Sequence, residues 1–203
     1  RPGTARAWAF FVTVARSFTD GSPKTSNGIY LAHVSSTYLI AVGSNRRHPI
    51  YGLPQGVVLA AMEECAAFGT VTARAPVIAT PPMGAARRRF ANSALVLDSE
   101  LSPTALLAAL KHTERAFGRR RGQRWGDRVL DLDVVLWSGG PWRSRGRGQG
   151  RSGDLTIPHP AFAQRRFVLT PALAIAPDWR AGPHGLTISQ AHARLTRSRP
   201  LPR

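Results

Sequence analysis

The chain has 203 residues, of which 43% are hydrophobic, so it is long enough to bury the core of one domain. Its 28 Lys and Arg against 11 Asp and Glu give a formal net charge of +17, which points to an anionic partner, either a nucleic acid or a polyphosphate ligand. One cysteine excludes an internal disulfide framework and a cysteine-based zinc site, and no run approaches the ~20 apolar residues of a membrane span.

Residues 1–36 differ in composition from the rest of the chain. They contain a single acid, Asp20, and one short apolar run at 7–14, so they superficially resemble a transit peptide or a secretory signal. A clear small-residue cleavage site is missing, however, and nothing later in the chain is typical of an extracellular protein. We predict that 1–36 is a poorly ordered extension of upstream translated sequence, outside the functional domain.

From residue 37 onward, the hydrophobic pattern alternates between the spacing of strands and the spacing of helices. A glycine ends the first predicted helix, and Ser102-Pro103 starts the second with an N-cap hydroxyl followed by proline. Cys65 lies among apolar residues of the first helix, which favours a buried residue over a nucleophile. The predicted elements are a strand at 38–42, a helix at 53–68, strands at 71–79 and 90–97, a helix at 102–116 and a strand at 129–137.

This order predicts an α+β fold, a ferredoxin-like (split βαβ) sandwich in which both helices pack on one face of an antiparallel or mixed sheet. The domain covers 37–180. A Gly-, Arg- and Ser-rich stretch at about 138–153 predicts a flexible insertion, and 181–203 is assigned to a C-terminal tail without further interpretation.

Asp131-Leu132-Asp133 stands out within an otherwise apolar strand. Residues i and i+2 of a strand share a face, with Cα atoms roughly 6.5–7 Å apart. Two carboxylates so placed repel each other unless cations lie between them, and paired magnesium ions would satisfy both and clamp a phosphoryl group. The alternative is a pair of surface acids at a strand end, solvated or paired with arginine.

The loop before this strand is rich in arginine, whose planar fork binds phosphate in a bidentate manner. Arginines beside a carboxylate pair are what a polyphosphate needs, although a solvated run, a nucleic-acid patch or biased codon usage would also explain them. A Walker-type phosphate loop is absent from the sequence. The loop and its flanks supply Glu114, Arg119, Arg120, Arg121, Arg124, Trp125 and Arg128.

Over about residues 38–179 the chain resembles the 6-hydroxymethyl-7,8-dihydropterin pyrophosphokinase family, because four blocks occur in the family's order and spacing. The resemblance implies an ATP:6-hydroxymethyl-7,8-dihydropterin diphosphotransferase of folate biosynthesis, in which the hydroxymethyl oxygen attacks the β-phosphorus of ATP and AMP leaves. The blocks are YLIAVGSN at 38–45, TPPMG at 80–84 with FAN at 90–92, the stretch 114–133 that ends in DLD, and LTIPHP at 155–160 with 165–169 and 175–177.

The family's site residues carry over position by position. Asp131 and Asp133 would hold two Mg²⁺ ions, and the rings of Phe90 and Phe167 would enclose the pterin. No general base is evident, so positioning and charge neutralisation would carry the catalysis. The implied catalytic residues are Arg119, Arg121, Arg128, Asp131 and Asp133; the ATP site adds Glu114, Trp125, His159 and Arg165; the pterin site is Thr80, Pro82, Phe90, Asn92 and Phe167.

Some positions depart from the family pattern or have simpler explanations. Phe90 stands where tyrosine is usual, and Asp127 stands where proline is usual. The segment 43–45 could be only a turn, His159 could be structural, and the two phenylalanines could be core residues. Arg120 and Arg124 favour a solvated position.

Two other functions stay open at this point. A nucleic-acid-binding module would explain the charge, but two aspartates beside the arginines would repel a nucleic-acid backbone. A different Asp-x-Asp transferase acting on sugar nucleotides would share the metal pair. We expect a cytoplasmic monomer whose partners are ATP and the pterin, with neither a membrane nor a nucleic acid among them.

Overall fold

The computed structural model describes residues 35–82, 86–118, 127–144 and 155–197. Nearly all of the predicted N-terminal extension and three predicted site residues, Arg119, Arg121 and Trp125, lie outside these ranges. The elements are β1 (Ser36–Ser44), α2 (Pro54–Glu64), a 3-10 helix (Cys65–Phe68), β2 (Thr70–Arg74), β3 (Ile78–Thr80), β4 (Phe90–Ser99), α3 (Pro103–Ala116), β5 (Asp131–Trp137), β6 (Trp142–Ser144), β7 (Leu155–Ile157), a 3-10 helix (Phe162–Gln164), α4 (Arg166–Ile175) and α5 (Ile188–Thr196).

The main sheet has the strand order β2-β4-β1-β5, with β3 also paired to β4, and every pairing is antiparallel. This is the order that a split βαβ plan requires, so the predicted α+β class is confirmed. The strand predicted at 71–79 is in fact two strands. Pro76 lies between β2 and β3, where a residue without an N–H cannot contribute a donor to the ladder.

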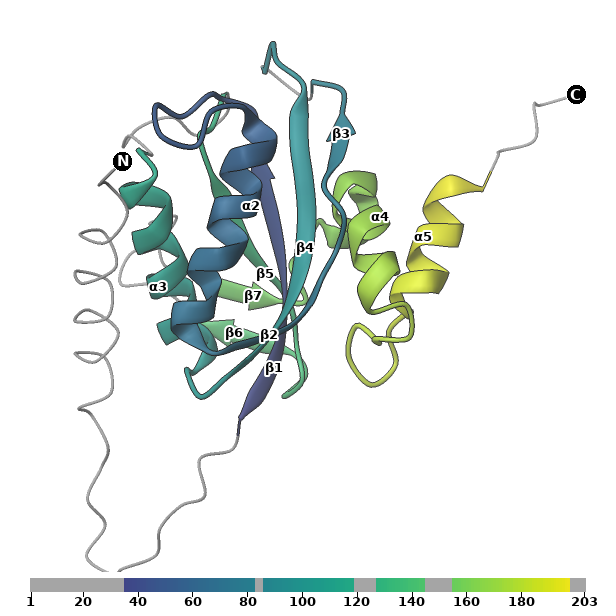
Figure 1. Ribbon diagram of the computed structural model, residues 1–203. Helices are drawn as coiled ribbons and strands as arrows, with labels where there is room; N and C mark the ends of the chain where they lie inside the picture. The colour runs from purple at the N-terminus through teal and green to yellow at the C-terminus, as the bar shows by residue number, and fades with distance from the viewer. Residues whose placement is uncertain (1–34, 83–85, 119–126, 145–154, 198–203) are drawn as a thin grey trace, which may run out of the picture.

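Helices cover both faces of this sheet (Figure 1). The alternation along β1 sends Tyr38, Ile40 and Val42 into a core with α2 and α3, as predicted for the first two helices. Leu39 points the other way, into a second core that includes Leu169 of α4 and residues of α5. The second layer of helices was not predicted, and it places α4 over the face that carries the site.

The helix starts follow from local chemistry. The Ser102 hydroxyl accepts from Ala105 N at 3.3 Å and Pro103 is the first helical residue of α3, as predicted. α5 lies within the stretch assigned to an uninterpreted tail, and its start is a full capping box: Thr187 Oγ1 accepts from Gln190 N at 3.1 Å, and Gln190 Oε1 accepts from Thr187 N at 3.0 Å. The tail assignment therefore missed a capped helix.

Part of the stretch assigned to the insertion at 138–153 is regular structure. Trp142–Ser144 forms β6, which pairs with β7, and the Trp142 ring meets Trp137 edge-on with centroids 5.3 Å apart. Aromatic packing joins this ribbon to the core shared with α2 and α3. The low average hydrophobicity of the stretch 138–153 gave no indication of this contact. Residues 145–154 lie outside the described ranges. Among the described residues, none of the helices combines the length and apolarity needed to cross a bilayer.

Candidate active site

The predicted site residues that the structure describes gather at the end of the sheet where β1 stops and β4 and β5 begin. In the strand register, Asn92 of β4 pairs with Gly43 of β1, which pairs in turn with Asp131 of β5. Directly paired residues of neighbouring strands point to the same face, so these three positions form one row on the α4 side of the sheet. The amide and the carboxylate thus face the same space across β1.

Gly43 keeps that space open. A Cβ at this position would lie 2.9 Å from Asn92 Oδ1, closer than side chains tolerate. The next row also has a small residue on β1, since Ala41 lies between Ala94 of β4 and Asp133 of β5. The segment 43–45 is therefore more than a turn, because its glycine leaves room between the amide of Asn92 and the carboxylate of Asp131.

Asp131 and Asp133 share the α4 face of β5, with side chains 28% and 30% exposed, while Leu132 between them is buried on the opposite face. Both carboxylates meet cations. Arg128 Nη1 donates to Asp131 Oδ1 at 2.7 Å, and Arg165 Nη1 lies 4.0 Å from Asp133 Oδ2. The alternation along the strand confirms that the two acids lie on one face, and arginines from two separate segments converge on them.

Lys111 and Glu114 of α3 approach the same strand from its outer edge. Lys111 Nζ donates to Glu114 Oε1 at 2.6 Å and to the carbonyl of Leu132 at 2.8 Å, and Glu114 Oε1 also accepts from Leu132 N at 2.8 Å. Lys111 Nζ is also 3.4 Å from Asp133 Oδ1. Sequence reasoning placed Glu114 at the nucleotide and missed Lys111. The available signal was the spacing of the two residues, one helical turn apart on a helix that leads into the arginine loop.

Burial and neighbouring charges shift the pKa values of Glu114, Asp133 and His159. Burial raises the pKa of Glu114, and the charge of Lys111 offsets only part of this rise. Burial also acts to raise the pKa of Asp133, but Lys111, His159 and Arg165 outweigh it, so that pKa lies below its usual value. Burial lowers the pKa of His159, against the pull of Asp133. The site thus holds an ionised Asp133 beside an imidazole that favours its neutral form.

His159 and Arg165 reach the site from the segment between β7 and α4. His159 N donates to Val135 O at 3.0 Å, which fastens this segment to β5. His159 Nδ1 accepts from Ala161 N at 3.2 Å, so the proton of the neutral ring lies on Nε2. The Arg165 guanidinium lies 5.7 Å from the ring centre of Phe167, in cation–π range.

Most of the predicted pterin residues lie on the same face of the sheet. Asn92 Nδ2 donates to Thr80 Oγ1 at 2.8 Å, and Asn92 is 4% exposed. Phe90 is two residues before Asn92 on β4 and points to the same side. Phe167 is the second residue of α4 and packs at the margin of the core on that side. Pro82 is exposed, two residues beyond the end of β3.

Asn45 anchors the chain just before β5. Its backbone N donates to Arg128 O at 3.0 Å, its Oδ1 accepts from Arg128 N at 2.6 Å, and its Nδ2 donates to Asp127 Oδ1 at 2.8 Å. Asp127 Oδ2 also lies 3.8 Å from Arg88 Nη1. The acid that departs from the family's proline is thus a hydrogen-bond acceptor that helps to hold Arg128 near Asp131.

The two aspartates suit a magnesium site that depends on the substrate. Across the described residues, no group of three or more His, Cys, Asp and Glu side chains comes together as a complete metal cage. Mg²⁺ is commonly bound by one or two carboxylates, with phosphate oxygens and water completing its coordination. Asp131 and Asp133 fit that role, and the surrounding cations suit the polyphosphate that would bring the remaining ligands.

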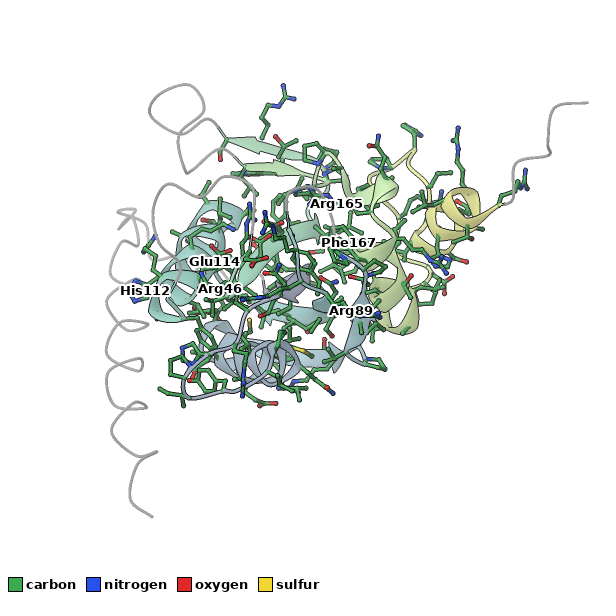
Figure 2. All side chains as sticks on the ribbon, turned by 90° about the horizontal axis from the view of Figure 1, so that it is seen from above. Arg46, Arg89, His112, Glu114, Arg165 and Phe167 are labelled. Carbon is green, nitrogen blue, oxygen red and sulfur yellow. The ribbon has the colours of Figure 1, made fainter. Side chains whose placement is uncertain are left out.

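Basic side chains also flank this end of the sheet (Figure 2). Arg46 follows β1 and Arg89 precedes β4, and both are exposed. In the view from above, Arg46 and Glu114 lie on one side of the site, and Arg165 and Phe167 lie on the other. Part of the positive charge noted in the sequence therefore lies around the carboxylate pair.

Comparisons with known proteins show the family to which the chain is similar. The family model for 7,8-dihydro-6-hydroxymethylpterin-pyrophosphokinase (HPPK) matches residues 39–177. A 2-amino-4-hydroxy-6-hydroxymethyldihydropteridine pyrophosphokinase of Methylorubrum extorquens is 39% identical over 62% of this chain and 73% of that protein. The Haemophilus influenzae protein of the same name is 33% identical over 70% of this chain and 82% of its own length.

Solved structures support the fold independently of sequence. A crystal structure of wild-type Plasmodium falciparum HPPK-DHPS superposes with a TM-score of 0.60 at 10% identity, over 79% of this chain. This chain spans only 41% of that one. From the family match and the relatives, the chain belongs to the 7,8-dihydro-6-hydroxymethylpterin-pyrophosphokinase family and has the role of that family, a pyrophosphokinase of folate biosynthesis.

Proposed function

We propose that this enzyme transfers the diphosphate of ATP, in a Mg²⁺-dependent reaction, to the hydroxymethyl group of 6-hydroxymethyl-7,8-dihydropterin and releases AMP. The observation that carries the proposal is the row Asn92–Gly43–Asp131. It sets an amide suited to a pterin edge and a carboxylate suited to a cation on one face, with a glycine between them.

The pterin would bind at the β4 side of this row. The hydrogen bond to Thr80 fixes the orientation of the Asn92 amide, and Oδ1 lies close to where a side chain of Gly43 would stand. An amide in a fixed orientation can donate to and accept from the amide-like edge of a pterin. Phe90 and Phe167, which lie on the same side of the sheet, offer flat apolar surfaces for the ring system.

The triphosphate would bind at the β5 side. Arg128 and Arg165 already converge on the two aspartates, and we propose that Arg119 and Arg121 join them. Asp131 and Asp133 would hold Mg²⁺, which when bound supplies charge neutralisation and orientation to the phosphate oxygens. The arginines would stabilise the charge that spreads over the transferred group as the hydroxymethyl oxygen attacks in line.

His159 and Trp125 belong to the same proposed nucleotide site. His159 Nε2 carries the proton of the neutral ring and can donate one hydrogen bond to a phosphate or ribose oxygen. Because burial lowers the pKa of His159, this contact would be made by a neutral donor at neutral pH.

The first test is AMP release from ATP and Mg²⁺, with and without 6-hydroxymethyl-7,8-dihydropterin. We expect pterin-dependent AMP, which falls by at least about 10²-fold in Asp133→Ala, the scale on which loss of a charge stabiliser acts. Asp178→Ala is a matched control, because Asp178 is an exposed acid beyond α4. A folded wild-type protein that binds ATP but releases no AMP with the pterin would overturn the proposal.

We further propose that the enzyme works in the cytoplasm as a monomer. Cys65 is fully buried, and burial raises the pKa of its thiol to about 12, so it is neither a nucleophile nor available for a disulfide in the folded state. Light scattering coupled to gel filtration should give the mass of one chain. A mass of two chains that persists on dilution would contradict the monomer.

A further inference from the structure

At Leu132 the outer edge of β5 is covered by two side chains where a further strand would otherwise pair. β5 is the last strand in the order β2-β4-β1-β5, and β1 occupies its other side. The N–H and C=O of Leu132 point outward from this edge, because Glu114 accepts from the first and Lys111 donates to the second. The two side chains together replace the donor and acceptor that a further strand would present.

Leu132 is the residue between the two aspartates. Its two peptide groups link it to Asp131 and Asp133, so anything that fixes the position of those groups also fixes the separation and direction of the two carboxylates. The bonds at 2.8 Å to N and to O hold both peptide groups at once. The Lys111 ammonium, 3.4 Å from Asp133 Oδ1, restrains one of the carboxylates directly.

A contribution to folding stability does not by itself explain why Lys111 and Glu114 occupy these positions. Glu114 is 1% exposed, so its carboxylate has lost nearly all of its contact with bulk water. A buried ion pair can be replaced by apolar residues of similar volume with little loss of stability, and sometimes with a gain. What apolar residues cannot do is hold the two peptide groups of an edge strand.

We propose that Lys111 and Glu114 form a clamp, defined by these two side chains on the peptide groups of Leu132, that positions the Asp131–Asp133 pair for Mg²⁺ and nucleotide. Both are positioning residues in this role, since they act through the backbone of β5 and through Asp133. This inference rests on the proposed function and names the part of α3 that prepares its metal site.

The clamp predicts a specific binding defect. In Lys111→Met the aliphatic stem remains while the ammonium and its bonds are lost. Loss of a partner that orients metal ligands typically weakens metal affinity 10–100-fold. We expect the Mg²⁺ concentration that half-saturates binding of a non-hydrolysable ATP analogue to rise by that factor, and the affinity for the pterin to change by less than about twofold.

The experiment is calorimetric titration of the wild type, Lys111→Met, Lys111→Met/Glu114→Leu and the control Arg194→Met, an exposed residue of α5. Every protein is titrated below its melting temperature, with near-UV circular dichroism as the check on folding. The double variant carries no unpaired buried charge, so a defect that persists in it reports positioning and not instability. Normal Mg²⁺ dependence in either Lys111 variant overturns the proposal.

The same samples keep the two proposals separate. Wild-type protein that binds Mg²⁺ and the nucleotide analogue but makes no AMP with the pterin would refute the proposed function and leave the clamp measurable. Wild-type activity together with unchanged Mg²⁺ dependence in the Lys111 variants would refute the clamp alone. A second readout is amide hydrogen exchange at Leu132, which should speed up at least about tenfold in the double variant, because its N–H loses the buried acceptor that protects it.

Discussion

The two faces of the sheet are built for different purposes, and β1 shows the contrast within one strand. Toward α2 and α3 it presents Tyr38, Ile40 and Val42, all buried in a continuous core. Toward α4 it presents Leu39 at its start, but then only Ala41 and Gly43 as it approaches the site. One face is filled along the whole strand, whereas the other is filled at one end and left bare at the end where Asn92 and Asp131 lie.

Stability and chemistry are therefore separated by the face of the sheet and by position along the strands. Substitutions on the α2–α3 face should reduce the free energy of unfolding and leave the activity of the folded fraction intact. Substitutions on the opposite face, at the end where Asn92 and Asp131 lie, should reduce the activity and change the free energy of unfolding little.

The largest effect is expected for Asp131→Asn. The variant removes a negative charge from the proposed metal site and weakens the hydrogen bond that Arg128 Nη1 donates at 2.7 Å, because an amide oxygen is a poorer acceptor than a carboxylate. We expect kcat/KM for AMP formation to fall about 10³-fold, the upper range for loss of a charge stabiliser. The melting temperature should change little, because the side chain is partly exposed and sits in no core. A large loss of stability with near-normal activity would reverse the assignment of this face.

A matched pair of buried leucines tests the two faces directly. Leu106 of α3 packs on the filled face and Leu169 of α4 packs on the site face, and both are fully buried. Each Leu→Ala change should cost about 3 kcal/mol of unfolding free energy. Only Leu169→Ala should also raise the KM for the pterin, because α4 carries Phe167 at its start. Denaturant titration and kinetics on the same samples measure both quantities.

Gly43→Ala should produce a smaller and more local effect. The new methyl group would lie 2.9 Å from Asn92 Oδ1 and push the amide from its position. We expect about a tenfold rise in the KM for the pterin, with kcat changed less, and a stability cost of about 1 kcal/mol from overpacking. Ala60→Gly in α2 is a control with a similar stability cost. A KM equal to that of the wild type would show that the pterin does not depend on this row.

The sequence predicted the main strands, the start of α3 and the shared face of the two aspartates. Short apolar runs located β1, β4 and β5, and the Ser102-Pro103 pair located the start of α3 within one residue. The Asp131-Leu132-Asp133 pattern needed only the two-residue period of a strand to place both acids on one face. These features depend on neighbours in sequence, so the sequence contains them.

Other features depend on contacts between distant residues. The role of Lys111 requires Leu132, 21 residues away, on the outer edge of a strand whose neighbours sequence alone does not reveal. The role of Gly43 as a spacer appears only when the register with β4 and β5 is known. α5 is a different case, since the Thr187–Gln190 capping box was present in the sequence and went unnoticed in a polar stretch. The predicted roles of Arg119, Arg121 and Trp125 remain predictions.

The smallest expected effect concerns α5, which lies on the same side of the sheet as α4 (Figure 1). It packs in the second core, which contains Leu39 and Leu169, and not at the row formed by Asn92, Gly43 and Asp131. Thr187→Ala removes the hydroxyl that accepts from Gln190 N and should cost about 1 kcal/mol of unfolding free energy. Thr187→Ser keeps the cap and should cost little. Activity of the folded protein should be unchanged, as measured by kcat/KM at a temperature where each variant is folded. If Thr187→Ala instead lowers kcat/KM, then α5 supports the start of α4. The part of this face on which activity depends would then extend beyond the row at Gly43, as far as α5.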